Sequence, residues 1–270
     1  MGTLLVVNVA LTVLACFLFW WRQRMKNFEQ AIQVVTEAYR KGEYESGLQL
    51  AEKLKRARST PPVYWLFRGR MLYQLGQLKE AEYCLRRSSS METEPRRQAP
   101  AREALGKVLM EQKQYDEAIA NFEACMEACP ASGSGHRALA EAWLRKGIRA
   151  GDALGSARLA VKIARTERAR TRYTQSLNLA EALATLAWAV AAHSSDAAEV
   201  ERLLEEAFPL CGDEYRQIRA HLHCMAAAAY SALGTAGGRE RSADHLQQAA
   251  AADPQGTYGR RAAALLEAAV

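Results

Sequence analysis

The chain has 270 residues, 49% of them hydrophobic and 24% charged, and this composition excludes a wholly disordered protein. Its net charge of +6 is spread over segments of mixed sign, without the dense basic block interleaved with aromatics that is typical of nucleic-acid binding. Strong β-formers are sparse beyond residue 40, where Ala, Leu, Glu, Arg and Gln dominate, so the composition predicts an all-α fold.

The N-terminus carries a long uncharged run, Gly2–Trp21 (GTLLVVNVALTVLACFLFWW). Twenty residues at a rise of about 1.5 Å make roughly 30 Å of helix, enough to cross a hydrocarbon core. Positive charge follows at once, and such charge marks the cytoplasmic side. We therefore predict a single-pass membrane anchor with its basic flank at residues 1–26, its N-terminus outside and the rest of the chain in the cytoplasm. Its marker residues are Leu4, Leu11, Phe17, Trp20, Trp21, Arg22, Arg24 and Lys26.

Three other interpretations of this run fit less well. A cleaved signal peptide would carry its positive charge before the apolar run and end in small residues, whereas here Phe-Leu-Phe-Trp-Trp ends it. Val13–Cys16 resembles a lipoprotein box but has no basic segment before it. Myristoylation at Gly2 would favour Ser or Thr at the sixth position, which is Val6. An exported or lipid-anchored assembly factor stays the alternative.

Three short segments of the following chain are similar to one another. Residues 41–47 (KGEYESG) align with residues 75–81 (LGQLKEA) at a shift of 34, and residues 112–118 (QKQYDEA) repeat the pattern 37 residues further on. Each segment reads as a tight turn followed by an acidic first turn of helix, with an amphipathic stretch on both sides. The pattern predicts repeated helix–turn–helix units.

These units resemble the tetratricopeptide repeat family, whose unit is a helix–turn–helix of 34 residues. The third unit carries the resemblance most clearly, with Leu105, Gly106, Tyr115, Ala118, Phe122 and Pro130, and the second carries Trp65, Gly69, Gly76, Leu78, Ala81 and Leu85. The resemblance implies an α-solenoid in which a small residue (Gly69, Gly106, Ala140) lets two helices approach, and Ala81 or Ala118 fits the facing position. An irregular helical bundle is the alternative.

We expect the repeat domain to span residues 27–254, as about six helix pairs of which the fifth is divergent. The later pairs are predicted at 174–193 with 197–208 and at 215–233 with 239–252, the last joined by an enlarged turn at 234–238. Residues 255–270 are predicted to form a capping helix, which the exposed end of a solenoid requires. The polar segment 86–100 (RRSSSMETEPRRQAP) reads as a surface connection.

No catalytic, cofactor or metal site is visible in the sequence. Gly234–Gly238 lacks the Gly-Lys-Ser/Thr ending of a phosphate-binding loop, and Cys211, His221, His223 and Cys224 lack the paired spacing of zinc ligands. The acidic residues fall on amphipathic helices close to Arg or Lys, and we interpret them as solvated. The six cysteines, irregularly spaced, are expected to be free thiols in a reducing compartment. A helical enzyme with an unrecognised site stays the less favoured alternative.

In the resembled family, the first helix of each unit lines a concave groove, and the resemblance implies that a peptide or protein partner binds there. The carboxylate clamp of chaperone-docking members is missing, because its positions hold Ile32, Thr36, Arg70, Tyr73, Glu103 and Lys107. We therefore expect a membrane-anchored adaptor that binds another protein and is not an enzyme. The predicted groove residues are Thr36, Tyr39, Arg40, Leu66, Arg70, Tyr73, Glu103, Lys107, Met110, Arg137, Glu141 and Leu144.

Overall fold

The computed structural model describes residues 22–23, 26, 29–39, 41–52, 60–166 and 172–268, and within these ranges it contains helices and no strand. A helix at 29–39 comes first. It is followed by α2 (Tyr44–Ala51), α3 (Pro62–Gln74), α4 (Leu78–Ser90), α5 (Pro95–Glu111), α6 (Tyr115–Ala128), α7 (Gly133–Lys146), α8 (Ala150–Thr166), α9 (Arg172–Ser194), α10 (Ala197–Ala207), the 3₁₀ turn η2 (Phe208–Leu210), α11 (Arg216–Ala232), α12 (Ala236–Ala252) and α13 (Thr257–Ala268).

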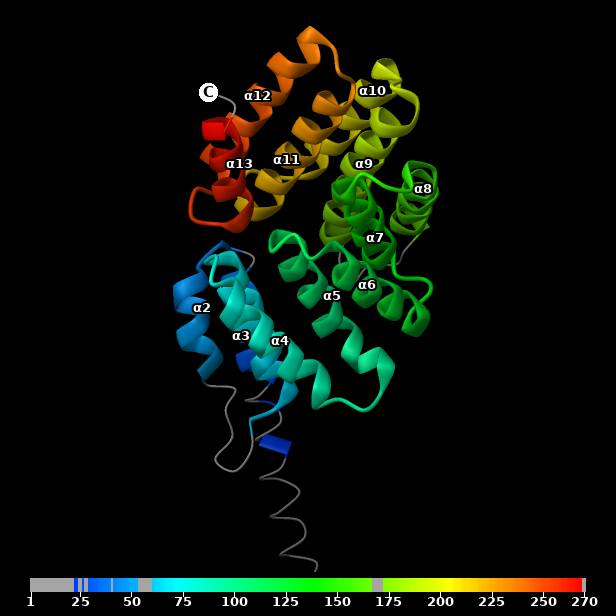
Figure 1. Ribbon diagram of the computed structural model, residues 1–270. Coiled ribbons are helices and arrows are strands. Elements are labelled where there is room, and N and C mark those ends of the chain that lie inside the picture. The colour runs from blue at the N-terminus through cyan, green and yellow to red at the C-terminus, as the bar shows by residue number, and fades with distance from the viewer. Residues whose placement is uncertain are drawn as a thin grey trace, which may run out of the picture.

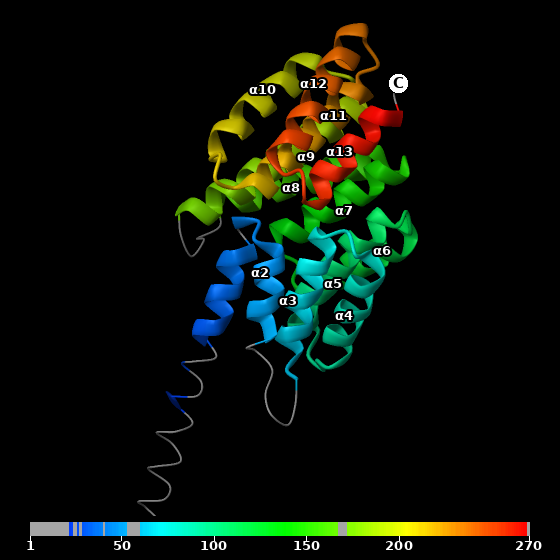
Figure 2. The same cartoon turned by 90° about the vertical axis from the view of Figure 1, so that its left-hand side faces the viewer.

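Helices that follow each other in the chain pack side by side, as Figures 1 and 2 show. The first helix of each pair also contacts the first helix of the next, so that α3, α5, α7, α9 and α11 form a continuous inner row. The last helix, α13, packs on α11 and α12, and its N-terminal turn lies near the top of α3 in Figure 1. The predicted all-α, tetratricopeptide-like solenoid is confirmed for the described residues.

Small residues set the distance between the two helices of a pair, as the repeat pattern predicts. A Cβ atom built on Gly106 of α5 would lie 2.5 Å from the Phe122 ring of α6, and one on Gly69 of α3 would lie 2.6 Å from Leu85 of α4. Phe122, Leu85 and Ala118 are fully buried. The glycines are therefore required for this packing, because the side chains they face have no room to move.

The polar segment 86–100 is mostly helical, so the prediction of a long surface connection is wrong. Helix α4 continues to Ser90 and α5 begins at Pro95, which leaves Met91–Glu94 as the connection. Pro95 suits the first turn of a helix because no intrahelical partner exists there for the N–H that it lacks. Ser88 is buried, and its hydroxyl donates to the carbonyl of Pro62 at 2.9 Å.

The prediction of an enlarged turn at 234–238 is also wrong, because α12 begins at Ala236. Thr235 is its N-cap, and its hydroxyl accepts a hydrogen bond from the N–H of Gly238 at 3.0 Å. Gly238 lies within the first turn of α12. The position requires glycine, because a Cβ there would come within 2.6 Å of the carbonyl oxygen of Tyr230. Close contact between α11 and α12 explains this glycine.

The apolar run Gly2–Trp21 lies outside the described residues, and so does Arg24. The predicted anchor residues Leu4, Leu11, Phe17, Trp20 and Trp21 are therefore not placed, whereas Arg22 is helical and exposed. None of the helices in the described part of the chain combines the length and the apolar character that a bilayer crossing needs.

The cysteines of the described residues are free thiols. Cys84, Cys125, Cys211 and Cys224 are buried, and burial raises the pKa of each. For Cys125 and Cys224 the pKa reaches about 12. These thiols pack as small hydrophobic side chains and stay protonated at neutral pH.

Candidate binding site on the concave face

The concave side of the solenoid is closed by contacts between its N-terminal units and the C-terminal cap. The hydroxyl of Thr257, at the start of α13, donates to the carbonyl of Tyr73 at 2.5 Å. The guanidinium of Arg260 donates to the carbonyl of Gln74 at 2.8 Å. Both carbonyls belong to the last turn of α3, where a helix leaves its carbonyls without intrahelical partners. Helix α13 therefore joins the end of α3 to the far end of the array.

A second set of contacts strengthens this closure. The hydroxyl oxygen of Tyr39 accepts from Nε2 of Gln74 at 3.2 Å and from Nε2 of Gln217, on α11, at 3.1 Å. The hydroxyl of Tyr44 donates to Oδ2 of Asp253 at 3.1 Å, and burial raises the pKa of both groups. The Asp253 carboxylate follows α12, so these bonds tie the first unit to the last pair.

The closure reduces the groove to a cavity of about 200 Å³. This is smaller than the usual 300–1,000 Å³ of small-molecule sites, and holds roughly seven waters at about 30 Å³ each. The cavity lies between residue 39 and helices α3, α5, α9, α11 and α13. Its lining residues are Tyr39, Arg70, Tyr73, Glu103, Ala104, Lys107, Glu181, Gln217, Ile218 and Tyr258.

The structure brings five of the predicted groove residues into this cavity: Tyr39, Arg70, Tyr73, Glu103 and Lys107. The others divide by burial. Met110, Arg137 and Glu141 are buried, whereas Thr36, Leu66 and Leu144 are half-buried, and the two leucines pack against the core. Arg40 lies outside the described residues. Glu181, Gln217, Ile218 and Tyr258 were missed by the sequence analysis, since they come from the divergent later units and the cap.

A chain of buried ion pairs lies beneath the cavity. On α7, Arg145 contacts Oε1 of Glu141 at 2.7 Å through one nitrogen and Oε1 of Glu111 at 2.9 Å through the other. Arg261 of α13 reaches the same Glu111 oxygen at 2.9 Å. Arg137 lies 3.5 Å from Oε2 of Glu181 on α9. The pairs connect α5, α7, α9 and α13 across the concave interior.

His221 of α11 lies between two of these carboxylates. Its Nδ1 is 2.8 Å from Oε1 of Glu181, its Nε2 is 3.5 Å from Oε2 of Glu141, and its ring stacks on Tyr258 at 4.3 Å. Burial alone would lower the pKa of His221, but the hydrogen bonds and charges of Glu141 and Glu181 raise it. The His221 ring and Tyr258 thereby fix α13 to α11.

The carboxylates of this region are held ionised. Burial alone would raise the pKa of Glu103, but Lys107 at 2.9 Å, with Arg70 and Arg137, lowers it to about 2. Burial likewise opposes ionisation of Glu181, and Arg137, His221 and Lys107 lower its pKa to about 2. Arg145, His221 and Arg137 overcome burial to lower the pKa of Glu141 well below its usual range.

The interpretation of the acidic residues as solvated is therefore wrong for this set. Glu141 is 3% exposed and Arg137 is 4% exposed, both among the most buried charges of the described chain. A signal for this existed: Arg137, Glu141 and Arg145 recur every fourth residue on the first helix of a unit, and so lie on one face. Because α7 belongs to the inner row of helices and this face is its concave side, the spacing places three charges in the interior.

Arg70 differs from the other charged residues of the cavity. Glu103 is held by Lys107 and by the hydroxyl of Ser134 at 3.1 Å, and Glu181 by Arg137 and His221. Arg70, by contrast, has no carboxylate within ion-pair distance among the described residues. The charge that is available to a ligand is therefore a guanidinium, in a cavity that also contains three tyrosines. This arrangement suits a carboxylate.

The four Cys and His residues considered as metal ligands go to separate partners. Nδ1 of His223 lies 2.9 Å from Nδ1 of His245, whereas His221 joins the ion pairs and the thiol of Cys224 donates to the carbonyl of Tyr258 at 3.5 Å. The thiol of Cys211 donates to the carbonyl of Gly212. Within the described residues no group of three or more His, Cys, Asp or Glu side chains is placed to hold a metal ion.

Comparison with known proteins agrees with this fold. The sequence profile of a tetratricopeptide repeat matches residues 99–132, which contain the third unit. No curated protein matches the sequence. A structure reported under the functional characterization of Pseudomonas aeruginosa pilF is similar, with 14% identity, 90% of this chain and 99% of that chain covered, and a TM-score of 0.51.

Two further structures are similar over a shorter part. MamA from Desulfovibrio magneticus RS-1 has 17% identity, covers 68% of this chain and 94% of its own, and has a TM-score of 0.48. The tetratricopeptide-like repeats of a putative kinesin light chain from Podospora anserina have 17% identity, the same coverage of 68% and 94%, and a TM-score of 0.49.

Proposed function

Because this chain is a tetratricopeptide-like helical repeat protein, a fold typical of protein–protein interaction scaffolds, we propose that it is an adaptor that takes one acidic residue of a partner protein into the concave cavity. The observation that carries the proposal is the guanidinium of Arg70, which has no carboxylate within ion-pair distance among the described residues, in a cavity lined by Tyr39, Tyr73 and Tyr258. An Arg side chain offers two parallel N–H donors to a carboxylate, and the tyrosine rings contribute apolar contact area.

The size of the cavity supports binding of a single side chain of the partner, and not of a long peptide along the groove. A helix with its side chains is about 10–12 Å wide, and neither it nor an extended strand fits a volume of about 200 Å³. A single Glu or Asp side chain, or one terminal residue, does fit. In this proposal the partner covers the mouth of the cavity and inserts one carboxylate, while the ion pairs beneath hold the walls in place.

The proposal is for a binding protein and not an enzyme. General acid–base catalysis works best with groups whose pKa lies near the working pH. Glu103 and Glu181, with a pKa of about 2, are poorly suited to take up protons at neutral pH. His221 is clamped between two carboxylates and stacked on Tyr258, which supports a role in holding α11 to α13.

We propose further that the adaptor is anchored in a membrane by Gly2–Trp21, with the repeat domain in the cytoplasm. The uncharged length of this run, the two tryptophans at its end and the cations Arg22, Arg24 and Lys26 support that orientation. The free, buried thiols of the described residues suit a reducing compartment. Resistance to alkaline carbonate tests the anchor, and protease added to inverted vesicles tests the side. Degradation in right-side-out vesicles would instead favour the exported alternative.

The carboxylate site can be tested with single-residue probes on the full-length chain in nanodiscs. The probes are N-acetylglutamate N-methylamide and its glutamine counterpart, and the reporter is the ¹³C-labelled methyl of Ile218, which lines the cavity. We expect the glutamate probe alone to shift this methyl signal. The shift should be lost in Arg70→Gln and kept in Arg158→Gln, which removes an exposed arginine of α8. Equal shifts from both probes would contradict a carboxylate site.

A further inference from the structure

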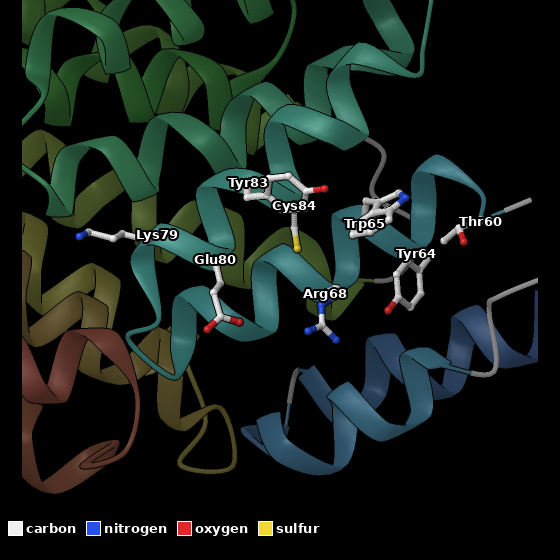
Figure 3. Close-up of a pocket in the computed structure, with 8 residues that line it drawn as sticks. All are labelled: Thr60, Tyr64, Trp65, Arg68, Lys79, Glu80, Tyr83 and Cys84. Carbon is white, nitrogen blue, oxygen red and sulfur yellow. The ribbon is translucent and has the colours of Figure 1, made fainter.

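An open pocket at α3 and α4, separate from the concave cavity, is lined by aromatic and cationic side chains. It has a volume of about 700 Å³, and Figure 3 shows Trp65 and Tyr83 lying on one side of α3, with Tyr64 and Arg68 on the other. Its lining is distinct from that of the concave cavity. We define a patch that consists of Trp65, Arg68, Tyr83, Arg87 and Met91, together with the buried Tyr64 that packs against Trp65.

The patch combines stacked aromatic rings with a cation. The Trp65 ring lies 5.1 Å from Tyr64 and 6.1 Å from Tyr83, both edge to face. The guanidinium of Arg87 lies 4.5 Å from the centre of the Trp65 ring and donates to the hydroxyl of Tyr83 at 2.9 Å. Tyr83 and Met91 are 57% and 43% exposed, among the most exposed large hydrophobic residues of the described chain. The Nε1–H of Trp65 has no acceptor in this environment among the described residues.

The patch lies at the edge of the domain where the N-terminal chain enters it. Successive helices are antiparallel, so the start of the helix at 29–39, the end of α2, the start of α3 and the end of α4 share one edge. Trp65 stands in the first turn of α3, and Arg87 and Met91 stand at the end of α4. A membrane that holds the N-terminal run therefore faces this edge.

The charge of this edge is positive. Arg87 and Arg68, whose guanidinium lies 3.5 Å from Oε1 of Glu52, belong to the patch, and the sequence that connects Glu52 to Thr60 contains Lys53, Lys55, Arg56 and Arg58. An anionic leaflet attracts cations that lie near its surface. Trp and Tyr prefer the headgroup level, because their rings are apolar at one end and polar at the other.

We propose that the patch docks on the anionic phospholipid headgroups of the membrane in which the N-terminal run is anchored. The inference rests on the membrane anchor of the proposed function and extends it. The arginines approach the phosphate and carboxylate groups of the lipids, while the rings of Trp65 and Tyr83 and the side chain of Met91 enter the headgroup layer. The domain is thus held at two points, by its anchor and by the patch, so that it has one fixed orientation on the membrane.

The test uses the full-length chain in nanodiscs that carry a gadolinium-chelating lipid, with the methionine methyls labelled by ¹³C. The reporter is Met91, and the internal control is Met225, which is 1% exposed and lies in α11. We expect relaxation of Met91 to be several-fold faster in discs with phosphatidylserine than in discs of phosphatidylcholine alone, with Met225 unchanged. The double variant Arg68→Gln/Arg87→Gln should weaken this lipid dependence, and Arg158→Gln/Arg202→Gln, which removes two exposed arginines from α8 and α10, should leave it unchanged.

The outcomes separate the inference from the proposal on which it rests. If the chain does not co-elute with the discs, the anchor proposal fails, and with it the premise of the inference. If the chain co-elutes but relaxation of Met91 is slow and insensitive to phosphatidylserine, the anchor stands and docking of the patch is overturned. Equal effects of the two double variants would also overturn it, because the response would then follow net charge and not this surface.

Discussion

Two buried regions of the same helical array differ in chemistry. One is the contact between α5 and α6, and the other is the concave interior. Between α5 and α6, Gly106 faces the buried ring of Phe122, and the contact is apolar and fixed by shape. On the concave side, Arg137, Glu141 and His221 are equally buried but are held by ion pairs. The first contact joins neighbours in sequence, and the second joins units that lie far apart in the chain.

The difference has a physical reason. Apolar packing within a unit is favourable in many similar geometries, so it can be repeated along a solenoid. Ion pairs need defined partners, and removing one partner leaves an uncompensated buried charge. The concave interior therefore specifies which helices meet across the closed array, whereas the contacts within a unit supply most of the buried apolar surface. Four predictions test this division, from the largest expected effect to the smallest.

The largest effect is expected for Glu141→Gln. This change removes the carboxylate shared by Arg145, Arg137 and His221. Only Glu111 and Glu181 then remain to balance the buried cations. Breaking a buried ion pair by removing one partner costs about 3–5 kcal/mol, so we expect the free energy of unfolding in urea to fall by about that amount. The control is Glu201→Gln, since Glu201 pairs with Arg241 at the surface, where its loss costs up to about 1 kcal/mol. Equal losses in the two variants would contradict a special role for the interior.

The apolar contact is tested by Gly106→Ala. Its new Cβ would lie 2.5 Å from the ring of Phe122, which is fully buried and has no space to turn, so we expect a loss of about 1–3 kcal/mol from overpacking. Gly155→Ala is the matched control on α8, because no atom lies within 4 Å of the new Cβ. There the better helix propensity of Ala should stabilise the protein by about 0.5–1 kcal/mol. Thermal denaturation distinguishes the two signs directly.

The two kinds of contact also differ in how well they can be predicted from the sequence. Gly106, Ala118 and Phe122 lie within one unit at fixed spacing, so a repeat pattern identifies them. The partners of Glu141 lie on α7 and α11, and no local pattern indicates that residues 181 and 221 meet. For the same reason, Arg70 and Tyr73 were foreseen as groove residues, whereas the closure of the groove by Thr257 and Arg260 was not. Local spacing predicts units; which units meet depends on the curvature of the whole array.

A pH titration separates the concave interior from a second buried polar pair. Burial, with the nearby His245 and Arg219, lowers the pKa of His223 to about 3, below the 6.5 of the unfolded chain. The unfolded state then binds more protons, so stability falls as pH is lowered from about 6.5 towards 3. The carboxylates Glu103 and Glu181, with pKa values of about 2, contribute stability that is lost only below about pH 4.

We therefore expect the free energy of unfolding to fall by up to about 2 kcal/mol between pH 7 and pH 5, chiefly through His223. His223→Gln removes this contribution, so its unfolding free energy should fall less than that of the unmodified protein over the same interval. The remaining dependence comes from His245, whose lowered pKa acts in the same direction, and from His221, whose raised pKa acts in the opposite direction. Urea denaturation at each pH measures both curves. An unchanged slope in His223→Gln would assign the acid sensitivity to other groups, such as His245, whose pKa burial also lowers.

The smallest effect is expected for Thr235→Ala, which tests a contact that belongs to neither region. Thr235 is the N-cap of α12, and its hydroxyl satisfies the N–H of Gly238. Loss of such a cap costs about 1 kcal/mol, whereas Thr235→Ser, which keeps the hydroxyl, should cost a few tenths of that. Hydrogen exchange should show faster opening confined to the first turn of α12. Exchange that also rose in α2 would mean that this local cap supports the closure through the hydrogen bond between Tyr44 and Asp253, and would join the two regions that the other predictions keep apart.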